Sequence, residues 1–218
     1  MFSFLRSPLP PRTNRAADNP IIYEDGASFL EFRESGSKYL LKNMHPPFDP
    51  NKPRSIMVPP FHYHIHQAEH FLITEGTCHL FKDTKDKPWM VISADEPGAQ
   101  KTAVIPKQIY HTLNNASSTK PMVIDVSLTP EDYEGEQRFF RNFFGYLDDC
   151  RKAGQPPSKF QLLVFLKSSD TPVGINMSFK WLGRVVSRVY LSTMAWWGYW
   201  ILGYKETYPE YYAGKKSR

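Results

Sequence analysis

The sequence FHYHIHQAEHFLITEG, residues 61–76, says more about the fold and chemistry of this chain than any other stretch. In it, His62, His64 and His66 are separated by single residues, and Glu69 follows. Successive side chains of a strand point to opposite faces, so a strand here would place all three imidazoles on one face. We therefore expect a strand that presents a cluster of metal-ligand side chains to the interior of a barrel.

A second histidine-bearing segment, PKQIYH, occupies residues 106–111 and ends in His111. Neutral imidazoles and one carboxylate together make a mixed nitrogen and oxygen site, which suits Fe, Mn, Ni, Cu or Zn and suits Ca or Mg poorly. An alternative is open at this point, because an HxH pair also occurs by chance and a buried histidine can simply be a hydrogen-bonded core residue.

Both segments resemble the motifs of the cupin superfamily. The first cupin motif is HxH, three or four residues, Glu, six residues and Gly, and His62-Tyr63-His64, Glu69 and Gly76 follow it with four and six intervening residues. The second is Pro-x-Gly-x-x-His-x-x-x-Asn. Its places are held here by Pro106, Gln108, His111 and Asn115, with glutamine replacing the glycine. Ile56 stands in place of the upstream glycine of the family.

The resemblance covers about residues 55 to 127 and implies a cupin-type jelly-roll β-barrel that binds one divalent transition metal. It maps the metal ligands onto four residues: His62, His64, Glu69 and His111. Iron is the first expectation for the metal, with Mn, Ni, Cu or Zn as alternatives.

Three residues are candidates for catalytic roles. Glu69 is expected to serve as a ligand and, if displaced, as a base, while His66 and Tyr110 are candidate pocket residues that orient substrate or move a proton. An alternative register with His64 and His66 as the HxH pair would leave only two residues before Glu69. His70 should point to the opposite face of the strand and play a structural part.

Short apolar stretches separated by glycines and prolines predict an antiparallel sandwich or a small barrel. The cupin resemblance implies the barrel, over residues 21–128. The expected strand segments are 21–23, 28–32, 38–41, 56–60, 71–73, 77–81, 89–92, 102–105 and 122–126. A proline-rich loop is expected over 44–50.

Helical periodicity replaces the strand pattern over residues 129–218, which we expect to pack on the barrel or on a partner subunit. Thr129 and Pro130 predict a helix start, and a second helix is expected over 157–167. The nearly uncharged segment 189–204 contains Trp196, Trp197 and Trp200. It has three interpretations: a helix packed on protein, which we favour, a helix lying at a membrane interface, or a short membrane anchor.

Composition excludes several classes of protein. The 218 residues carry a net charge of +5, but much of the basic excess lies in the tail before residue 20 and in Lys215, Lys216 and Arg218, so no nucleic-acid-binding face is expected. Residues 1–20 should form a flexible arm without the features of a signal peptide. Cys78 and Cys150 lack metal-ligand spacing, and reduced thiols in a cytoplasmic protein are expected.

The expected function is metal-dependent oxidation, for example by a dioxygenase, of a small apolar or aromatic molecule. The layout of the chain is similar to that of small fungal cupin proteins described as oxidoreductases near natural-product pathways, which supports this class. A non-oxidative isomerase, cyclase or decarboxylase and a non-catalytic binding cupin are the alternatives. A homodimer through the sheets or the aromatic last helix is the expected assembly.

Overall fold

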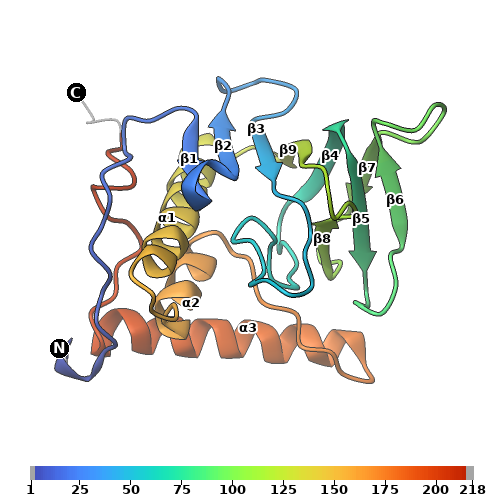
Figure 1. Cartoon of the computed structure of the whole chain (residues 1–218). Coiled ribbons are helices and arrows are strands. Elements are labelled where there is room, and N and C mark those ends of the chain that lie inside the picture. The colour runs from blue at the N-terminus through green and yellow to red at the C-terminus, as the bar shows by residue number, and fades with distance from the viewer. Residues whose placement is uncertain (1–2, 215–218) are drawn as a thin grey trace. The chain divides into compact units, whose positions relative to one another are not determined.

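The computed structural model describes residues 3–214, so Met1, Phe2 and the basic residues Lys215, Lys216 and Arg218 lie outside it. The chain forms two compact units (Figure 1). Residues 19–131 make a β unit, and the residues up to Asp18 and from Asp132 onward make a helical unit. The chain is thus mainly β, with a cupin-type unit followed by three helices.

The β unit contains two antiparallel sheets. The larger sheet has the strand order β1-β2-β3-β9-β4-β7 and the smaller one β6-β5-β8. The strands are β1 (Ile21–Tyr23), β2 (Ser28–Phe32), β3 (Leu41–His45), β4 (Ala68–Glu75), β5 (Thr77–Lys82), β6 (Met90–Ser93), β7 (Thr102–Ile105), β8 (His111–Asn115) and β9 (Met122–Thr129).

Strand alternation fixes which side chains reach the interior. Along β4, Glu69, Phe71 and Ile73 are buried while the residues between them are partly exposed. β9 runs between β3 and β4, and its residues Met122 to Val126 are all buried. The core is therefore largely apolar, and it includes two buried carboxylates, Glu69 at one end of β4 and Asp125 on β9.

Two strand predictions near the proline-rich loop are wrong. The segment predicted at 38–41 lies later, as β3, because Leu41–His45 pairs with both β2 and β9 and buries alternate side chains. The loop thus begins after His45 rather than at residue 44. Residues 56–58 form a turn instead of a strand: the Val58 amide donates to the carbonyl of Ser55, and the Ile56 amide donates to the Glu24 carboxylate.

Gly76, which closes the first cupin-like motif, sits at the sharp turn between β4 and β5. Its φ is +76°, and a Cβ placed there would lie 2.7 Å from the carbonyl oxygen of Pro121. Only glycine combines this backbone conformation with this close approach.

Replacing Gly76 by alanine should lower the free energy of unfolding by about 2–3 kcal/mol, because strain and a backbone clash add. Gly98→Ala is the matched control, since Gly98 also has positive φ but nothing lies within 4 Å of a Cβ there. Urea unfolding of the two variants measures the difference. Equal losses in both would show that the contact with Pro121 carries no cost.

The helical unit contains α1 (Tyr133–Lys152), α2 (Lys159–Ser168) and α3 (Lys180–Trp196), and α3 continues into a π-helical turn, η3 (Trp197–Ile201). The predicted start of the first helix is wrong: Thr129 ends β9, and the N-cap is Asp132. The Asp132 carboxylate accepts from the Gly135 amide, while Glu136 accepts from the Asp132 amide. This pair of bonds satisfies the exposed amides at the helix start better than Thr129 could.

The N-terminal segment, expected as a flexible arm over 1–20, contacts the helical unit in its described part. Arg15 is only 5% exposed and pairs with Asp148 and Asp149 of α1 at 2.5 and 3.3 Å. Its amide also donates to the carbonyl of Glu210, so the segment runs beside the C-terminal one (Figure 1). Among the described residues, the helices are all too short or too polar to cross a membrane.

Candidate metal centre

Four side chains converge in the β unit. The ligand atoms of His62, His64, Glu69 and His111 all lie within 4.8 Å of one another, and all four residues are buried. These are the four residues that the cupin-like motifs predict as metal ligands. The convergence of three imidazoles and one carboxylate favours the metal interpretation over isolated core histidines.

The backbone brings the two histidine segments together. His62 and His111 form an isolated antiparallel bridge, with the His62 amide 3.1 Å from the His111 carbonyl and the reverse bond at 2.8 Å. His111 is the first residue of β8 in the smaller sheet, whereas Glu69 belongs to β4 in the larger one. The cluster therefore connects the inner faces of the two sheets.

Two of the imidazoles are held in a fixed orientation by backbone carbonyls. His62 Nδ1 lies 2.7 Å from the carbonyl oxygen of Pro60, and His111 Nδ1 lies 2.8 Å from that of Ile109. A carbonyl only accepts hydrogen bonds, so each Nδ1 is the donor and each Nε2 points into the cluster. This is the orientation that metal-binding histidines take.

The ligand atoms lie close enough together to share one cation. His111 Nε2 lies 2.7 Å from Glu69 Oε2, and His64 Nε2 lies 3.3 Å from both that oxygen and His62 Nε2. Atoms that carry lone pairs come this close only with a proton or a metal ion between them. The donor set therefore fits a transition metal.

Burial and mutual charge favour the ligand forms of these groups. Burial, together with the nearby His111 and His64, holds the pKa of His62 well below its usual value. For Glu69, burial alone would raise the pKa, but the close contacts with His111 and His64 outweigh it and hold the pKa well below its usual range. A neutral imidazole and an ionised carboxylate are what a metal site requires.

The predicted strand through residues 61–67 is wrong, and His66 does not share a face with the other two histidines. The chain leaves the smaller sheet at the His62 bridge and enters the larger one at Ala68, so residues between them bend. His66 is exposed as a result. Its role in catalysis stays a prediction, and the register with His62 and His64 as the HxH pair agrees with the cluster.

Tyr110, the other candidate pocket residue, lies in an aromatic cluster. Its ring contacts Tyr63 edge-to-face at 5.1 Å and Phe61 at 5.7 Å, and all three are buried. Because Tyr63 and Tyr110 adjoin ligand histidines in sequence, this cluster braces the two segments that carry them. His70 alternates with Glu69 on β4 and lies on the opposite face, as predicted.

Three supporting features carry no sequence signal strong enough to predict them. The carbonyls of Pro60 and Ile109, each two residues before its histidine, are backbone groups and cannot be read from residue type. Gln108 adopts a φ of +63°, and its amide donates to the His64 carbonyl at 2.8 Å. The family glycine at this place could have suggested the left-handed backbone, but not that hydrogen bond.

A cleft of about 450 Å³ lies elsewhere in the β unit, beside His45 at the end of β3 and Asn114 of β8. His45 pairs with Met122 at one end of β9, whereas Glu69 pairs with Leu128 near the other. On β8, however, Asn114 lies three residues from His111, so at about 3.3 Å per residue the lining of the cleft comes within about 10 Å of the cluster. Burial lowers the pKa of His45 to about 3, so it stays neutral in the folded protein.

Stability should therefore fall as the pH drops from 6.5, the ordinary pKa of histidine, towards 3, because the unfolded chain protonates His45 in that window and the folded chain does not. We expect His45 to lower the free energy of unfolding by about 1.4 kcal/mol for each pH unit within this window. Urea unfolding of wild type and His45→Leu over this range measures it, with the shallower slope expected for the variant. Identical slopes would mean that His45 is protonated in the folded protein.

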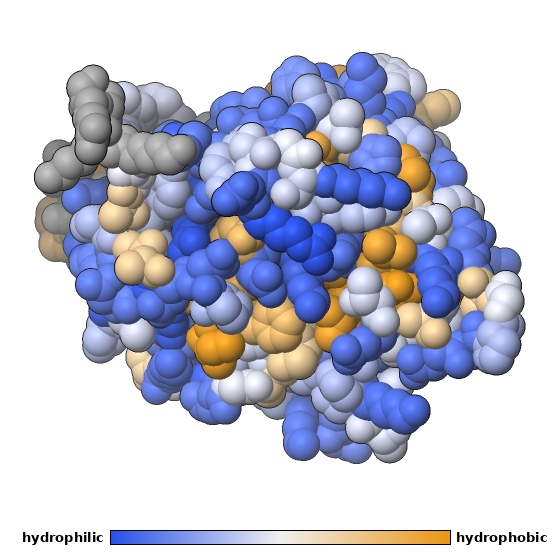
Figure 2. All heavy atoms as spheres, turned by 90° about the horizontal axis from the view of Figure 1, so that it is seen from above, coloured by the Kyte–Doolittle hydropathy of each residue, from blue (hydrophilic) through white to orange (hydrophobic). Residues whose placement is uncertain are grey.

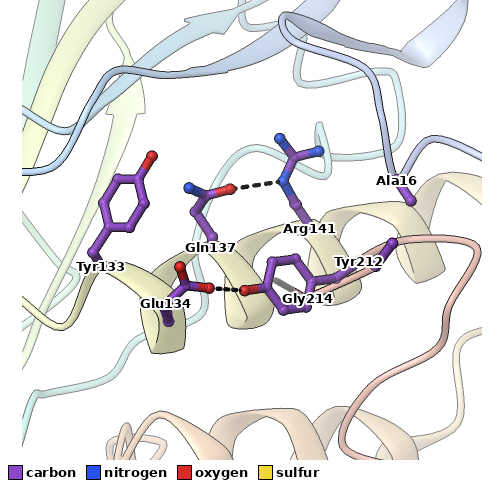
Figure 3. A pocket seen from close by; sticks show the side chains of 8 residues that line it. Ala16, Tyr133, Glu134, Gln137, Arg141, Tyr212 and Gly214 are labelled. Atoms are coloured by element: carbon purple, nitrogen blue, oxygen red, sulfur yellow. Dashed lines mark hydrogen bonds between the residues drawn. The ribbon is translucent and has the colours of Figure 1, made fainter. Parts of the chain in front are cut away.

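The helical unit has a smaller pocket of about 210 Å³ (Figure 3). The side chains lining it pair with one another: the Tyr212 hydroxyl donates to Glu134, and Arg141 donates to Gln137 at 3.3 Å. Burial and the bond to Glu134 raise the pKa of Tyr212 to about 12. These polar groups already have partners, so the metal cluster is the stronger candidate site.

The chain is similar to fungal proteins named as oxidoreductases. A protein of Hypocrea virens named "Probable oxidoreductase virH" is 28% identical over 94% of this chain and 92% of its own length. Oxidoreductase iacF of Pestalotiopsis fici is 26% identical over 81% of this chain and 87% of its own length. Epoxidase atD of Aspergillus terreus is 27% identical over 70% of this chain and 46% of its own length.

No family model matches the chain. Among solved structures, a cupin-2 domain protein from Shewanella frigidimarina is 16% identical with a TM-score of 0.29, covering 52% of this chain and 80% of that one. The CENP-C cupin domain of Drosophila melanogaster is 11% identical with a TM-score of 0.36, covering 55% and 85%. The cupin-type fold itself follows from the two-sheet order and the meeting of the two motifs at the metal cluster.

Proposed function

We propose that this protein is a metal-dependent oxidoreductase that oxidises a small, largely apolar molecule, in the manner of a dioxygenase. The metal is a divalent transition ion, iron in the first instance, held by four residues: His62, His64, Glu69 and His111. The observation that carries the proposal is the convergence of these four buried ligand atoms within 4.8 Å. The names of the fungal relatives favour oxidation as the reaction class.

The residues around this site have different roles in holding a metal ion. The backbone carbonyls of Pro60 and Ile109 fix His62 and His111 so that their Nε2 atoms stay directed at one point. Glu69 supplies the single negative charge and balances part of the charge of a divalent ion. With a redox-active ion held by these residues, the site would supply activation of O₂ or of the substrate for oxidation.

The inner surface beside the cluster supports an apolar substrate. Phe71 lies two residues beyond Glu69 on the same face of β4, and Leu113 lies two residues beyond His111 on β8, and both are buried. Ile105, the strand partner of Glu69, is buried as well. Apolar walls next to a few convergent polar groups are typical of small-molecule sites.

Oxygen consumption tests the proposal. Protein reloaded with Fe²⁺ under reducing conditions is mixed with a panel of small aromatic and terpenoid-like compounds, and dissolved O₂ is followed with an electrode. We expect consumption that depends on one class of compound and is absent from His64→Ala. Turnover of a compound by the loaded protein without O₂ uptake would overturn oxidation and favour Lewis-acid chemistry at the same ion.

A further inference from the structure

Helix α3 packs with its small residues inward. The buried residues of α3 are spaced four apart along the helix and are Gly183, Ser187, Leu191 and Ala195. In the following turn, Gly198 lies so close to α2 that a Cβ there would be 3.1 Å from Val164 and 3.2 Å from the Phe160 carbonyl. The spacing keeps these residues on one side of the helix, where they allow close approach to α2.

Outside this buried row, α3, its N-cap Phe179 and the following turn η3 expose large apolar side chains. Residues of this kind that are between 36% and 65% exposed are Phe179, Trp181, Val185, Val186, Val189, Tyr190, Trp196, Trp197, Tyr199 and Trp200. We call this set the outer face of α3. The surface seen in Figure 2 is mainly hydrophilic, with apolar residues gathered in a band across its middle.

This arrangement inverts the normal pattern of a surface helix. In water, a helix gains most by burying its largest apolar side chains, and an aromatic residue covers about 150–250 Å². Here glycine, serine and alanine are buried while four tryptophans, Trp181, Trp196, Trp197 and Trp200, are exposed. Small residues between helices and large ones outward are the pattern of helices that face lipid.

The charged side chains within residues 171–205 are all positive. Residues 171–205 contain no Asp or Glu, but they contain Lys180, Arg184, Arg188 and Lys205. Two copies of this face packed against each other would bring like charges together without a carboxylate from the segment to offset them. Anionic lipid headgroups would instead attract this positively charged segment.

We propose that the outer face of α3 docks on an anionic membrane surface, with the helix lying in the plane of the headgroups. Tryptophan and tyrosine are the residues best suited to that depth, where one part of the ring is apolar and another polar. Flanking lysine and arginine strengthen the attachment, as in other interfacial helices. This inference is independent of the metal and of the reaction.

Vesicle flotation of the full chain tests the proposal, with phosphatidylcholine vesicles compared with mixed phosphatidylcholine and phosphatidylglycerol vesicles. We expect binding to the mixed vesicles and a blue shift of tryptophan fluorescence. The variant Trp181→Ser/Trp196→Ser/Trp200→Ser should lose at least about tenfold in partitioning. The variant Arg188→Gln/Lys205→Gln should bind the mixed vesicles about fivefold more weakly for each charge removed.

Trp89→Ser is the matched control, because Trp89 is 42% exposed but lies in the β unit, outside α3. It should bind as the wild type does. Circular dichroism confirms that each variant is folded. Two outcomes would overturn the proposal: no flotation of the wild type with either kind of vesicle, or a dimer in light scattering that the triple tryptophan variant converts to a monomer while vesicle binding is absent.

Discussion

Replacing His111 by alanine should abolish stoichiometric metal binding and the activity that depends on it. The change removes one of four ligand atoms, breaks the 2.7 Å contact with Glu69 and leaves that buried carboxylate with fewer partners. Removing a residue that only hydrogen-bonds to a metal ligand typically lowers metal affinity about 10–100-fold. Removing a ligand itself should therefore lower it further. Competition with a chromophoric chelator measures the affinity directly.

His70→Ala is the matched control, since His70 neighbours Glu69 in sequence but lies on the opposite face of β4. It should keep both metal and activity, whereas His62→Ala should behave like His111→Ala. Metal binding that survives His62→Ala and fails in His70→Ala would mean that the strand faces are reversed from those described above.

Replacing Asp149 by alanine should lower the free energy of unfolding by about 3–5 kcal/mol, the cost of breaking a buried ion pair from one side. The Asp149 carboxylate accepts from the Thr13 amide and hydroxyl at 2.8 and 2.7 Å and from the Tyr211 hydroxyl at 2.7 Å. It also pairs with buried Arg15. Without it, the buried side chains of Tyr211 and Arg15 each lose an acceptor. Chemical denaturation of both proteins measures the change.

Asp49→Ala serves as the comparison, because Asp49 pairs at 3.6 Å with Lys52, whose side chain is 77% exposed. Exposed pairs of this kind contribute about 0–1 kcal/mol. If Asp149→Ala cost no more than Asp49→Ala, the contacts of the N-terminal segment with α1 would contribute nothing to stability.

That His62, His64 and Glu69 would lie together could be predicted from sequence because their pattern is local, whereas His111 is placed with them only by the second cupin-like motif. The HxH pair and Glu69 lie within eight residues, and strand alternation separates Glu69 from His70 correctly. His66 shows where such reasoning fails. Alternation holds only while the chain stays in a sheet, and the bend after the His62 bridge depends on pairing with His111, far along the chain.

The burial of the N-terminal segment could not be predicted for a related reason. Arg15 looks like one more charge in a polar, proline-rich tail, and its partners Asp148 and Asp149 lie more than 130 residues away. Ion pairs between distant segments leave no periodicity in either one. The inverted packing of α3 is hidden in the same way, since the tryptophans of residues 189–204 do not reveal which side of the helix is buried.

The central claim is that His62, His64, Glu69 and His111 hold a transition metal. Elemental analysis by mass spectrometry of protein purified without a histidine tag, wild type beside His64→Ala, tests it most directly. The account predicts close to one equivalent of a first-row transition metal, iron foremost, in the wild type and its loss in the variant. Equal metal content in the two proteins, or none in the wild type even after reloading, would contradict it.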